Sequence, residues 1–242
     1  MKQNILDRLN SILAYVAVIS LMITLLVTSI SVNCFNRDFF ASEYATLETA
    51  KDLGMTDKDL NGATNTLLDY LQDKRSTIKT TITLKGMEQD AFNSREASHM
   101  VDVKGLYQFA LVLRNVCVIL FVGSIIYLIV RLKQGALTLF SINYMKMAAI
   151  VGVFFTMLAI WAYADFDSFW TAFHKLMFRN DLWLLNPETD LMINLFPSQF
   201  FSSLVFRVVG MFASTFIIVF FASYLYLRKR LKKMNEAILN DD

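Results

Sequence analysis

The amino-acid sequence predicts a mainly α-helical membrane protein, in which a bundle of four transmembrane helices carries a small extracellular α-rich cap formed by two outer loops. Two observations lead to this prediction. Hydrophobic residues make up 55% of the chain and charged residues only 18%, against about 25% charged residues in ordinary globular proteins. Four apolar stretches are also long enough to cross a bilayer, which takes about 20 helical residues.

The four apolar stretches place the expected transmembrane helices within a single polytopic domain that spans residues 1–242. The first stretch carries no charge, is longer than the apolar core of a secretory signal and lacks a small-residue cleavage site, so we expect an uncleaved anchor. Gly123, Gly152 and Gly210 fall one in each of the other three, where small residues let helices approach closely. The expected spans are residues 11–33, 108–130, 142–164 and 208–227.

The polar segment 34–107 is patterned strongly enough to form the cap. We expect one helix from Ser42 to Gly54 and a second that opens at Thr56, because both begin with capping residues. The alternating, β-branched run 77–84 predicts a short strand. A third helix is expected to begin at Ser94 and to continue directly into the second span. Segment 165–207 then forms the second outer loop.

Lysine and arginine in the short segments predict the orientation of the chain. The N-terminal segment carries two of them, the connection 131–146 three, and the tail from Arg228 onward five. We therefore expect both termini in the cytoplasm and both large loops outside. The basic tail is interpreted as a topology determinant that also contacts anionic lipid.

This topology brings the two histidines of the chain to the same side of the membrane. His99 lies about two helical turns before the second span, and His174 follows the third. Imidazole exchanges protons near neutral pH, so the pair is a candidate acid–base site. The alternative is that both are surface histidines at a polar interface.

Two charged residues near these histidines are candidate supporting residues. Asp102 follows His99 by one helical turn and would be able to hold its imidazole in one tautomer; the alternative is a solvated carboxylate beside Lys104. Arg114 lies inside the second span. It either pairs with an aspartate of the second outer loop (Asp165 or Asp167) or extends its side chain to the headgroups.

The second outer loop is unusually aromatic. Between Tyr163 and Phe206 one residue in four carries an aromatic ring, against 14% for the chain. A belt of rings at the bilayer surface explains part of this enrichment. We favour a lined pocket for acyl chains, because the rings continue through Phe196-Pro197 and Phe200-Phe201. The expected lining and supporting residues are Trp170, Phe173, Phe178, Trp183, Asn186 and Asp190.

Other kinds of site are poorly supported by the sequence. No H-x-x-x-H or H-E-x-x-H spacing indicates a zinc site, and no G-x-S-x-G motif indicates a serine hydrolase. Cys34 and Cys117 show no metal or redox spacing and are interpreted as unpaired. The net charge of +2 gives no sign of nucleic-acid binding.

Two segments resemble a known family. SREASHMVDVKGL, ahead of the second span, and FHKLMF with NDLWLLNPETDLMINLFPSQFF, after the third, are similar to the bacterial lipoprotein intramolecular transacylase family, Lit. The resemblance implies four transmembrane helices under an extracellular cap. It also implies that His99 and His174 are catalytic and lie at the extracellular interface of the bacterial cell membrane.

The resemblance also implies the reaction. The substrate is a diacylated bacterial lipoprotein, and the sn-2 acyl chain of its diacylglyceryl-cysteine moves to the α-amine of the same cysteine, which gives the lyso-form. We expect no covalent acyl-enzyme, no cofactor, no metal and a monomer in contact with membrane lipid. The sequence does not assign the base; one hypothesis is His99 oriented by Asp102, with His174 as the donor.

Two other functions remain open on the residues alone. A membrane sensor or scaffold whose extracellular cap binds a ligand would show the same four spans and cap. A hydrolase would use the same histidines and release a free fatty acid.

Overall fold

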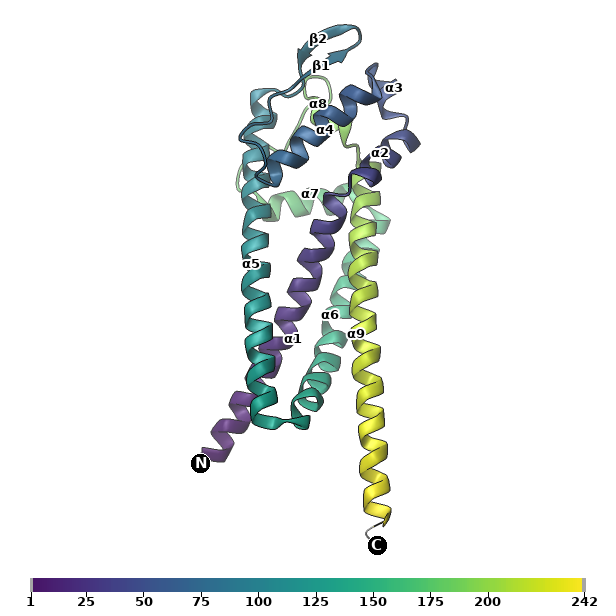
Figure 1. The fold of residues 1–242 in the computed structure, drawn as a ribbon. Coiled ribbons are helices and arrows are strands. Elements are labelled where there is room, and N and C mark those ends of the chain that lie inside the picture. The colour runs from purple at the N-terminus through teal and green to yellow at the C-terminus, as the bar shows by residue number, and fades with distance from the viewer. Residues whose placement is uncertain (1, 241–242) are drawn as a thin grey trace. The chain divides into compact units, whose positions relative to one another are not determined.

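The computed structural model describes residues 2–240, and the fold is mainly α-helical (Figure 1). In this described part, four helices are long and apolar enough to cross a membrane. Each contains one of the predicted spans, which confirms the predicted fold class and a multi-pass membrane protein. These helices are α1 (Lys2–Cys34), α5 (Ser94–Leu132), α6 (Gln134–Ala164) and α9 (Ser198–Asn240).

All four helices are longer than the apolar segments that predicted them. The difference is largest in α9, which begins ten residues before the expected span 208–227 and continues through the basic tail. Apolar length measures only what fits into hydrocarbon. A helix continues for as long as its backbone hydrogen bonds are unbroken, and residues such as Arg, Lys, Leu and Met have good helix propensity.

The chain divides into two compact units. We call the first the helical unit, which comprises Met1–Ser29, Val112–Ala159 and Val208–Asp242. We call the second the loop unit, which comprises Ile30–Leu111 and Ile160–Arg207. The loop unit contains both predicted outer loops, 34–107 and 165–207, together with a few residues of the expected spans that flank them.

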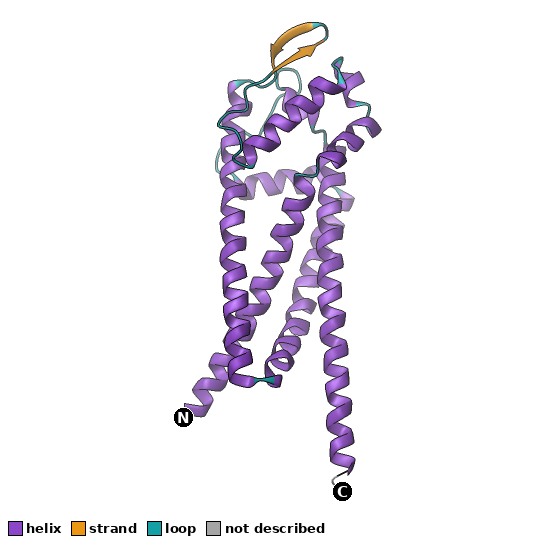
Figure 2. Ribbon diagram, viewed as in Figure 1, coloured by secondary structure: helices purple, strands orange, loops and turns teal. Residues whose placement is uncertain are grey.

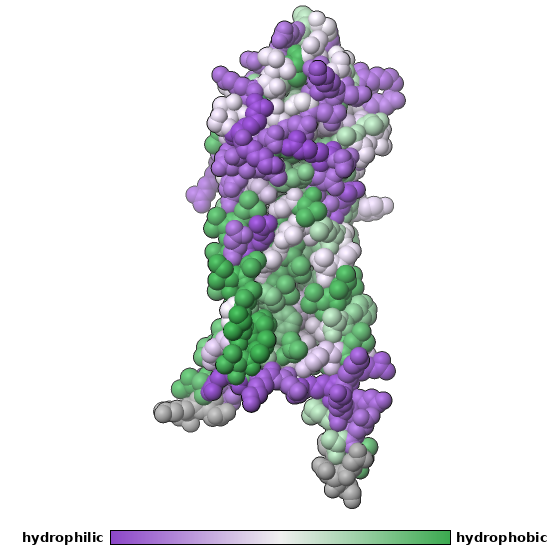
Figure 3. Space-filling model, in the orientation of Figure 1, coloured by the Kyte–Doolittle hydropathy of each residue, from purple (hydrophilic) through white to green (hydrophobic). Residues whose placement is uncertain are grey.

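The helical unit buries small clusters and exposes much apolar surface. One cluster contains Val18, Met22, Tyr144 and Ala148, and the Tyr144 hydroxyl donates to the carbonyl of Phe216 at 2.9 Å. Outward-facing residues such as Ile119 are 70% exposed. Figure 3 shows apolar side chains over these long helices. In water this arrangement would be costly, whereas hydrocarbon accommodates it.

The first half of the loop unit contains three short helices: α2 (Arg37–Thr46), α3 (Thr49–Leu53) and α4 (Asp57–Leu71). The single helix predicted from Ser42 to Gly54 is wrong, because the chain breaks at Glu48, whose φ of 52° is left-handed. The predicted ends are partly right. Gly54, with φ 69°, terminates α3, and the Thr56 side chain accepts from the backbone N–H of Asp59 at the start of α4.

The predicted strand is shorter than expected and forms a hairpin. Strand β1 (Thr81–Leu84) pairs antiparallel with β2 (Met87–Asp90), which the sequence reading missed; Figure 2 shows the two strands in orange. The intervening Lys85 and Gly86 both have positive φ, at 51° and 82°. That geometry matches the two-residue turns that suit the twist of paired strands.

The core of the loop unit joins α2 and α4 to the start of α9. Phe39, Phe40 and Tyr44 pack with Leu195 of α8 (Leu191–Leu195) and with Phe200, which is completely buried. The interpretation of Phe196 to Phe201 as pocket lining is therefore wrong for Phe200, which is a core residue. Its ring fills the space between α2 and α9, where burial of a phenylalanine stabilises the fold by about 1.5–3 kcal/mol.

Candidate catalytic site

His99 lies in the second turn of α5, before the apolar segment 108–130. The helix begins with a reciprocal capping box. The Asn93 side-chain oxygen accepts from the backbone N–H groups of Arg95 and Glu96, and the Glu96 carboxylate accepts from the Asn93 N–H at 2.7 Å. This start confirms the predicted third helix and fixes the face on which His99 projects.

His174 lies near the end of a separate helix, α7 (Phe166–Met177). Asp165 caps this helix by accepting from the N–H of Ser168 at 3.0 Å. Aromatic residues recur on one face of α7 and polar residues on the other, as in an amphipathic helix. His174 is on the aromatic face and follows Trp170 by one turn.

The loop unit brings the two imidazoles together. Their ring centroids are 6.1 Å apart and the ring planes are inclined by 35°. Both side chains are buried, with exposed fractions of 7% for His99 and 9% for His174. The juxtaposition predicted from topology is therefore present, and the alternative of two surface histidines does not describe it.

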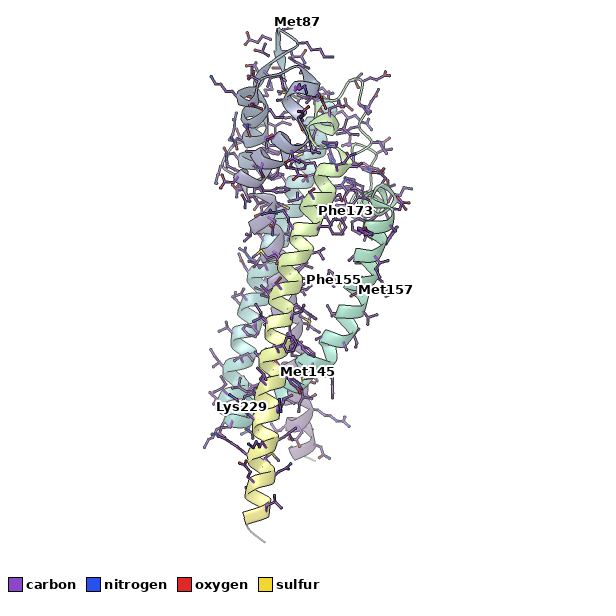
Figure 4. All side chains as sticks on the ribbon, turned by 90° about the vertical axis from the view of Figure 1, so that its right-hand side faces the viewer. Met87, Met145, Phe155, Met157, Phe173 and Lys229 are labelled. Atoms are coloured by element: carbon purple, nitrogen blue, oxygen red, sulfur yellow. The ribbon has the colours of Figure 1, made fainter. Side chains whose placement is uncertain are left out.

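Aromatic rings surround the pair. Four rings contact His174, with centroid distances between 4.8 and 5.7 Å, and they are the predicted Trp170, Phe173, Phe178 and Trp183. Phe178 also contacts His99 edge-on at 5.2 Å. Figure 4 labels Phe173 on α7.

Two further rings belong to this set: Phe201 was part of the aromatic run interpreted as pocket lining, whereas Phe166 was not predicted. Phe166 stacks on Trp170 at 5.7 Å and Phe201 contacts it at 4.5 Å. The spacing of Phe166, four residues before Trp170 in an amphipathic pattern, is a local signal that would have identified it.

The hydrogen bonding of the two imidazoles differs. His174 Nδ1 donates to the main-chain carbonyl of Trp170 at 2.8 Å. Because a carbonyl only accepts, this bond requires the proton on Nδ1 and leaves the Nε2 lone pair available in the neutral ring. His99 Nδ1, in contrast, is buried and has no hydrogen-bond partner among residues 2–240.

Burial also determines the protonation of both rings. The pKa of His99 is lowered from its ordinary 6.5 to about 4, chiefly by burial and also by the neighbouring His174, while the charge of Asp102 acts in the opposite direction. Burial likewise lowers the pKa of His174, against the opposing effect of its hydrogen bond to Trp170. At neutral pH both imidazoles are therefore uncharged, as a general base has to be before it takes a proton.

Asp102 does not orient His99 through a hydrogen bond. Its carboxylate accepts from the side-chain amide of Asn180 at 2.9 Å, which ties α5 to the loop that follows α7. The hypothesis that Asp102 fixes the imidazole tautomer is therefore not supported. One helical turn brings the carboxylate close enough to act through its charge, but the Asn180 amide takes its hydrogen bond.

Arg114 has a local partner as well. Its guanidinium donates to the side chain of the adjacent Asn115 at 3.2 Å. The two aspartates considered as partners bond elsewhere, Asp165 at the cap of α7 and Asp167 with the hydroxyl of Ser198 at 2.5 Å. Pairing of Arg114 with these carboxylates is not observed.

Asn186 and Asp190 form a compact turn before α8. One Asp190 oxygen accepts from the backbone N–H of Asn186, and the other accepts from the side-chain amide of Asn93, both at 2.7 Å. Burial raises the pKa of Asp190, but these hydrogen bonds outweigh it and hold the pKa below its usual range. The sequence predicted both residues as supporting residues but not the link from Asp190 to Asn93.

A metal centre is not indicated in the part of the chain that the structure describes. No group of three or more His, Cys, Asp or Glu side chains is arranged there to hold an ion. The two cysteines are free, as predicted.

Fold and site together define a class: a multi-pass membrane protein in which a buried, uncharged histidine pair lies among aromatic rings. The family model of the lipoprotein intramolecular transacylase Lit matches residues 15–201. The chain therefore belongs to the lipoprotein intramolecular transacylase family and is a membrane acyltransferase whose family acts on lipoproteins. This assignment supports the acyltransferase over the sensor or scaffold.

Solved structures show the same fold. The chain is similar to the membrane-integral lipoprotein intramolecular transacylase Lit from Bacillus cereus, with a TM-score of 0.76 and 18% identity over 93% of this chain and 99% of that one. It is also similar to a variant of that protein in which a histidine is replaced by alanine, with a TM-score of 0.73 and 18% identity over 96% and 100% of the two chains. No curated protein sequence matches the chain significantly.

Proposed function

We propose that this protein moves the sn-2 acyl chain of a lipoprotein's diacylglyceryl-cysteine to the α-amine of the same cysteine, with His174 as general base and His99 as hydrogen-bond donor. The observation that carries the proposal is the buried pair of imidazoles 6.1 Å apart, only one of which has a fixed tautomer. The product is the lyso-form lipoprotein, an isomer of the substrate.

The reaction requires proton transfers that two imidazoles can supply. An α-amine has a pKa near 8, so part of it is protonated at neutral pH. His174 Nε2 takes a proton from the nitrogen as this attacks the ester carbonyl carbon, and a C–N bond forms. The bond between that carbon and the glycerol oxygen then breaks, and the imidazolium returns the proton to the leaving oxygen. The net change is one acyl transfer without gain or loss of atoms.

His99 is assigned to the oxyanion. A pKa of about 4 keeps its ring neutral, and a neutral imidazole still carries one N–H donor. A donor placed where negative charge develops accelerates acyl transfer by about 10²–10³-fold. Because its buried Nδ1 has no partner among the described residues, the ring is free to adopt the tautomer that the substrate requires.

The aromatic surroundings suit an intramolecular reaction. Donor and acceptor belong to one molecule, so the site has to fold the lipid so that amine and ester meet. Orientation of this kind is worth effective molarities of roughly 10⁵–10⁸ M. Rings such as Trp170 and Phe178 bury the acyl chain and keep water from the ester, which favours transfer over hydrolysis.

The orientation in the membrane is part of the proposal. The basic residues of the N-terminal segment, the α5–α6 connection and the tail favour a cytoplasmic location for both termini. The loop unit with its histidine pair then faces outward, where mature lipoproteins are anchored. A reporter fused to the C-terminus should be active only in the cytoplasm, whereas one inserted in the exposed β1–β2 hairpin should be active only outside.

The test uses a bacterial host that lacks this activity. Transfer does not alter the mass of the lipoprotein, so the N-terminal lipopeptide is isolated and fragmented to locate the acyl chain. Expression of the wild-type protein should move it from glycerol to the amine. Release of free fatty acid without N-acylation would replace the proposal with a hydrolase, and an unmodified lipopeptide would refute both.

A further inference from the structure

Glu96 is the most deeply buried charged residue near the histidine pair. Only 1% of its surface is exposed. One carboxylate oxygen accepts from the backbone N–H of Asn93 at 2.7 Å, and the other accepts from the backbone N–H of Met192 at 2.6 Å. The first bond caps α5, whereas the second reaches a residue 96 positions away at the start of α8.

A second link runs beside the first. The Asn93 side-chain amide donates to Asp190, whose other oxygen accepts from the N–H of Asn186. Two buried carboxylates and one amide thus connect the first turn of α5 to segment 186–192. We call this set (Asn93, Glu96, Asp190 and the backbone N–H groups of Asn186 and Met192) the cap bridge.

Burying the two carboxylates of the cap bridge costs free energy, so the bridge is a poor way simply to stabilise the fold. Burial raises the pKa of Glu96, and the charge of Asp190 adds to that rise, while the hydrogen bonds from Met192 and Asn93 oppose it. Among the described residues neither carboxylate takes part in an ion pair. Buried carboxylates that are satisfied by hydrogen bonds without an ion pair contribute little net stability, and their presence is better explained if they fix one geometry.

The geometry that the cap bridge would fix is the position of the His99 imidazole. Glu96 and His99 are one helical turn apart on α5, so a shift of the helix start moves the imidazole with it. His174 is held by its own hydrogen bond to Trp170, whereas His99 Nδ1 has no such bond among residues 2–240. Its position therefore depends on the helix backbone and on contacts with Phe178 and His174.

We infer that Glu96 is a positioning residue for His99: by linking the first turn of α5 to Met192, it sets the separation of the two imidazoles. The inference rests on the proposed function, in which that separation determines the rate of acyl transfer. Misplacement of a reacting group by about 1 Å costs roughly 10²-fold in rate. Glu96 does not have to touch the substrate.

Glu96→Gln is the sharpest variant. Glutamine keeps the volume and one acceptor oxygen, but its NH₂ group replaces the second acceptor and faces a backbone N–H. One of the two bonds is therefore lost with little change of shape. Glu88→Gln, at an exposed position on β2, is the matched control. Asp190→Asn weakens the parallel link and serves as a second variant if Glu96→Gln does not fold.

The experiment measures both the rate of acyl transfer and the state of the two imidazole rings. Each purified full-length protein is assayed with a synthetic diacylglyceryl-cysteine peptide, and its ¹⁵N-labelled histidines are titrated by NMR; the chain has only two. We expect Glu96→Gln to lower kcat about 10- to 100-fold with KM within about twofold. The His99 resonances and titration should change, while those of His174 stay as in the wild type. The thermal midpoint should fall by only a few degrees, as expected for the loss of one buried hydrogen bond.

Each outcome either supports or overturns the positioning role of Glu96. A wild-type kcat and an unchanged His99 signal in Glu96→Gln would overturn the inference, as would equal perturbation of both histidines, which would indicate general destabilisation. Asp190→Asn should act in the same direction with a smaller effect, and Glu88→Gln should match the wild type. If the wild-type protein itself does not transfer the acyl chain, the proposed function fails, while the NMR titration still tests positioning.

Discussion

The two histidines lie 6.1 Å apart but are held in opposite ways. His174, on α7, donates to the carbonyl of Trp170 and contacts four aromatic rings. His99, on α5, has a buried Nδ1 without a partner among the described residues and contacts one of those rings, Phe178. His174 is held by its hydrogen bond and ring contacts, whereas the position of His99 depends more on the helix that carries it.

This difference in hydrogen bonding and contacts supports the two roles proposed for the rings. A general base needs a defined tautomer and a free lone pair, which the bond from Nδ1 to Trp170 gives to His174. A donor to a developing oxyanion needs an N–H and a precise position, which a neutral ring on an anchored helix provides. A buried pair with unequal surroundings is thus able to divide acid, base and donor roles between identical side chains.

The largest effect is expected from His174→Ala. Removal of a general base costs about 10²–10⁴-fold in rate, so acyl transfer should fall by that factor while the thermal midpoint changes little. The measurement is the initial rate of N-acylation of the synthetic lipopeptide. Lys175→Ala, at the neighbouring exposed position, should retain wild-type activity, and an equal loss there would point to damage of α7.

His99→Ala should follow, with a loss of about 10²–10³-fold. His99→Gln keeps an N–H donor on a flexible side chain of similar reach, so it should recover part of the rate. The same assay compares both variants with His174→Gln, which has no comparable way to act as a base. A greater loss in His99→Ala than in His174→Ala would reverse the two assigned roles.

The next prediction concerns how activity and the protonation of the two imidazoles depend on pH. Burial penalises the charged imidazolium, so the pKa of His99 falls to about 4 and that of His174 falls below its ordinary value. As pH drops through each lowered pKa the ring gains a proton, and activity should be lost on the acid side, when His174 becomes charged. NMR titration should find both rings neutral at pH 7; a ring that titrates above its ordinary value would contradict the buried site.

A smaller loss is expected when Trp170, whose ring contacts His174 edge-on at 4.8 Å, is replaced. Trp170→Leu keeps the main-chain carbonyl but loses contacts with His174, Phe173 and Phe201. The resulting shift of the imidazole should slow transfer about 10- to 100-fold. Trp161→Leu is the matched control, because Trp161 is 40% exposed and contacts Phe169; its rate should stay close to that of the wild type.

Asp102→Ala should have the smallest effect. It removes a hydrogen bond from Asn180, which at an exposed site is worth about 0.5–1.5 kcal/mol. Activity should fall less than about fivefold if this bond only steadies the loop after α7. A loss as large as that of His99→Ala would show that the carboxylate acts on the imidazole after all.

Local patterns predicted much of the fold. Apolar length identified the four spans, and capping residues identified the starts of α4 and α5, because hydrophobic period and helix caps depend on neighbours a few residues apart. The break at Glu48 and the second strand of the hairpin were missed. Glu48 carries no local signal of a left-handed backbone, which usually falls on glycine. The short exposed strand β2 has little apolar alternation.

The sequence by itself determined that this is a four-span membrane protein of the lipoprotein transacylase family with one histidine before the second span and one after the third. Only the tertiary structure decided how those histidines are held: the 6.1 Å separation, the bond from His174 to Trp170, the pairing of Asp102 with Asn180, and the link from Glu96 to Met192. The physical reason is the distance along the chain between the residues that interact. Spans and caps follow from interactions within a few helical turns, whereas most of these contacts join segments far apart in the chain, and packing selects one partner among several that the sequence allows.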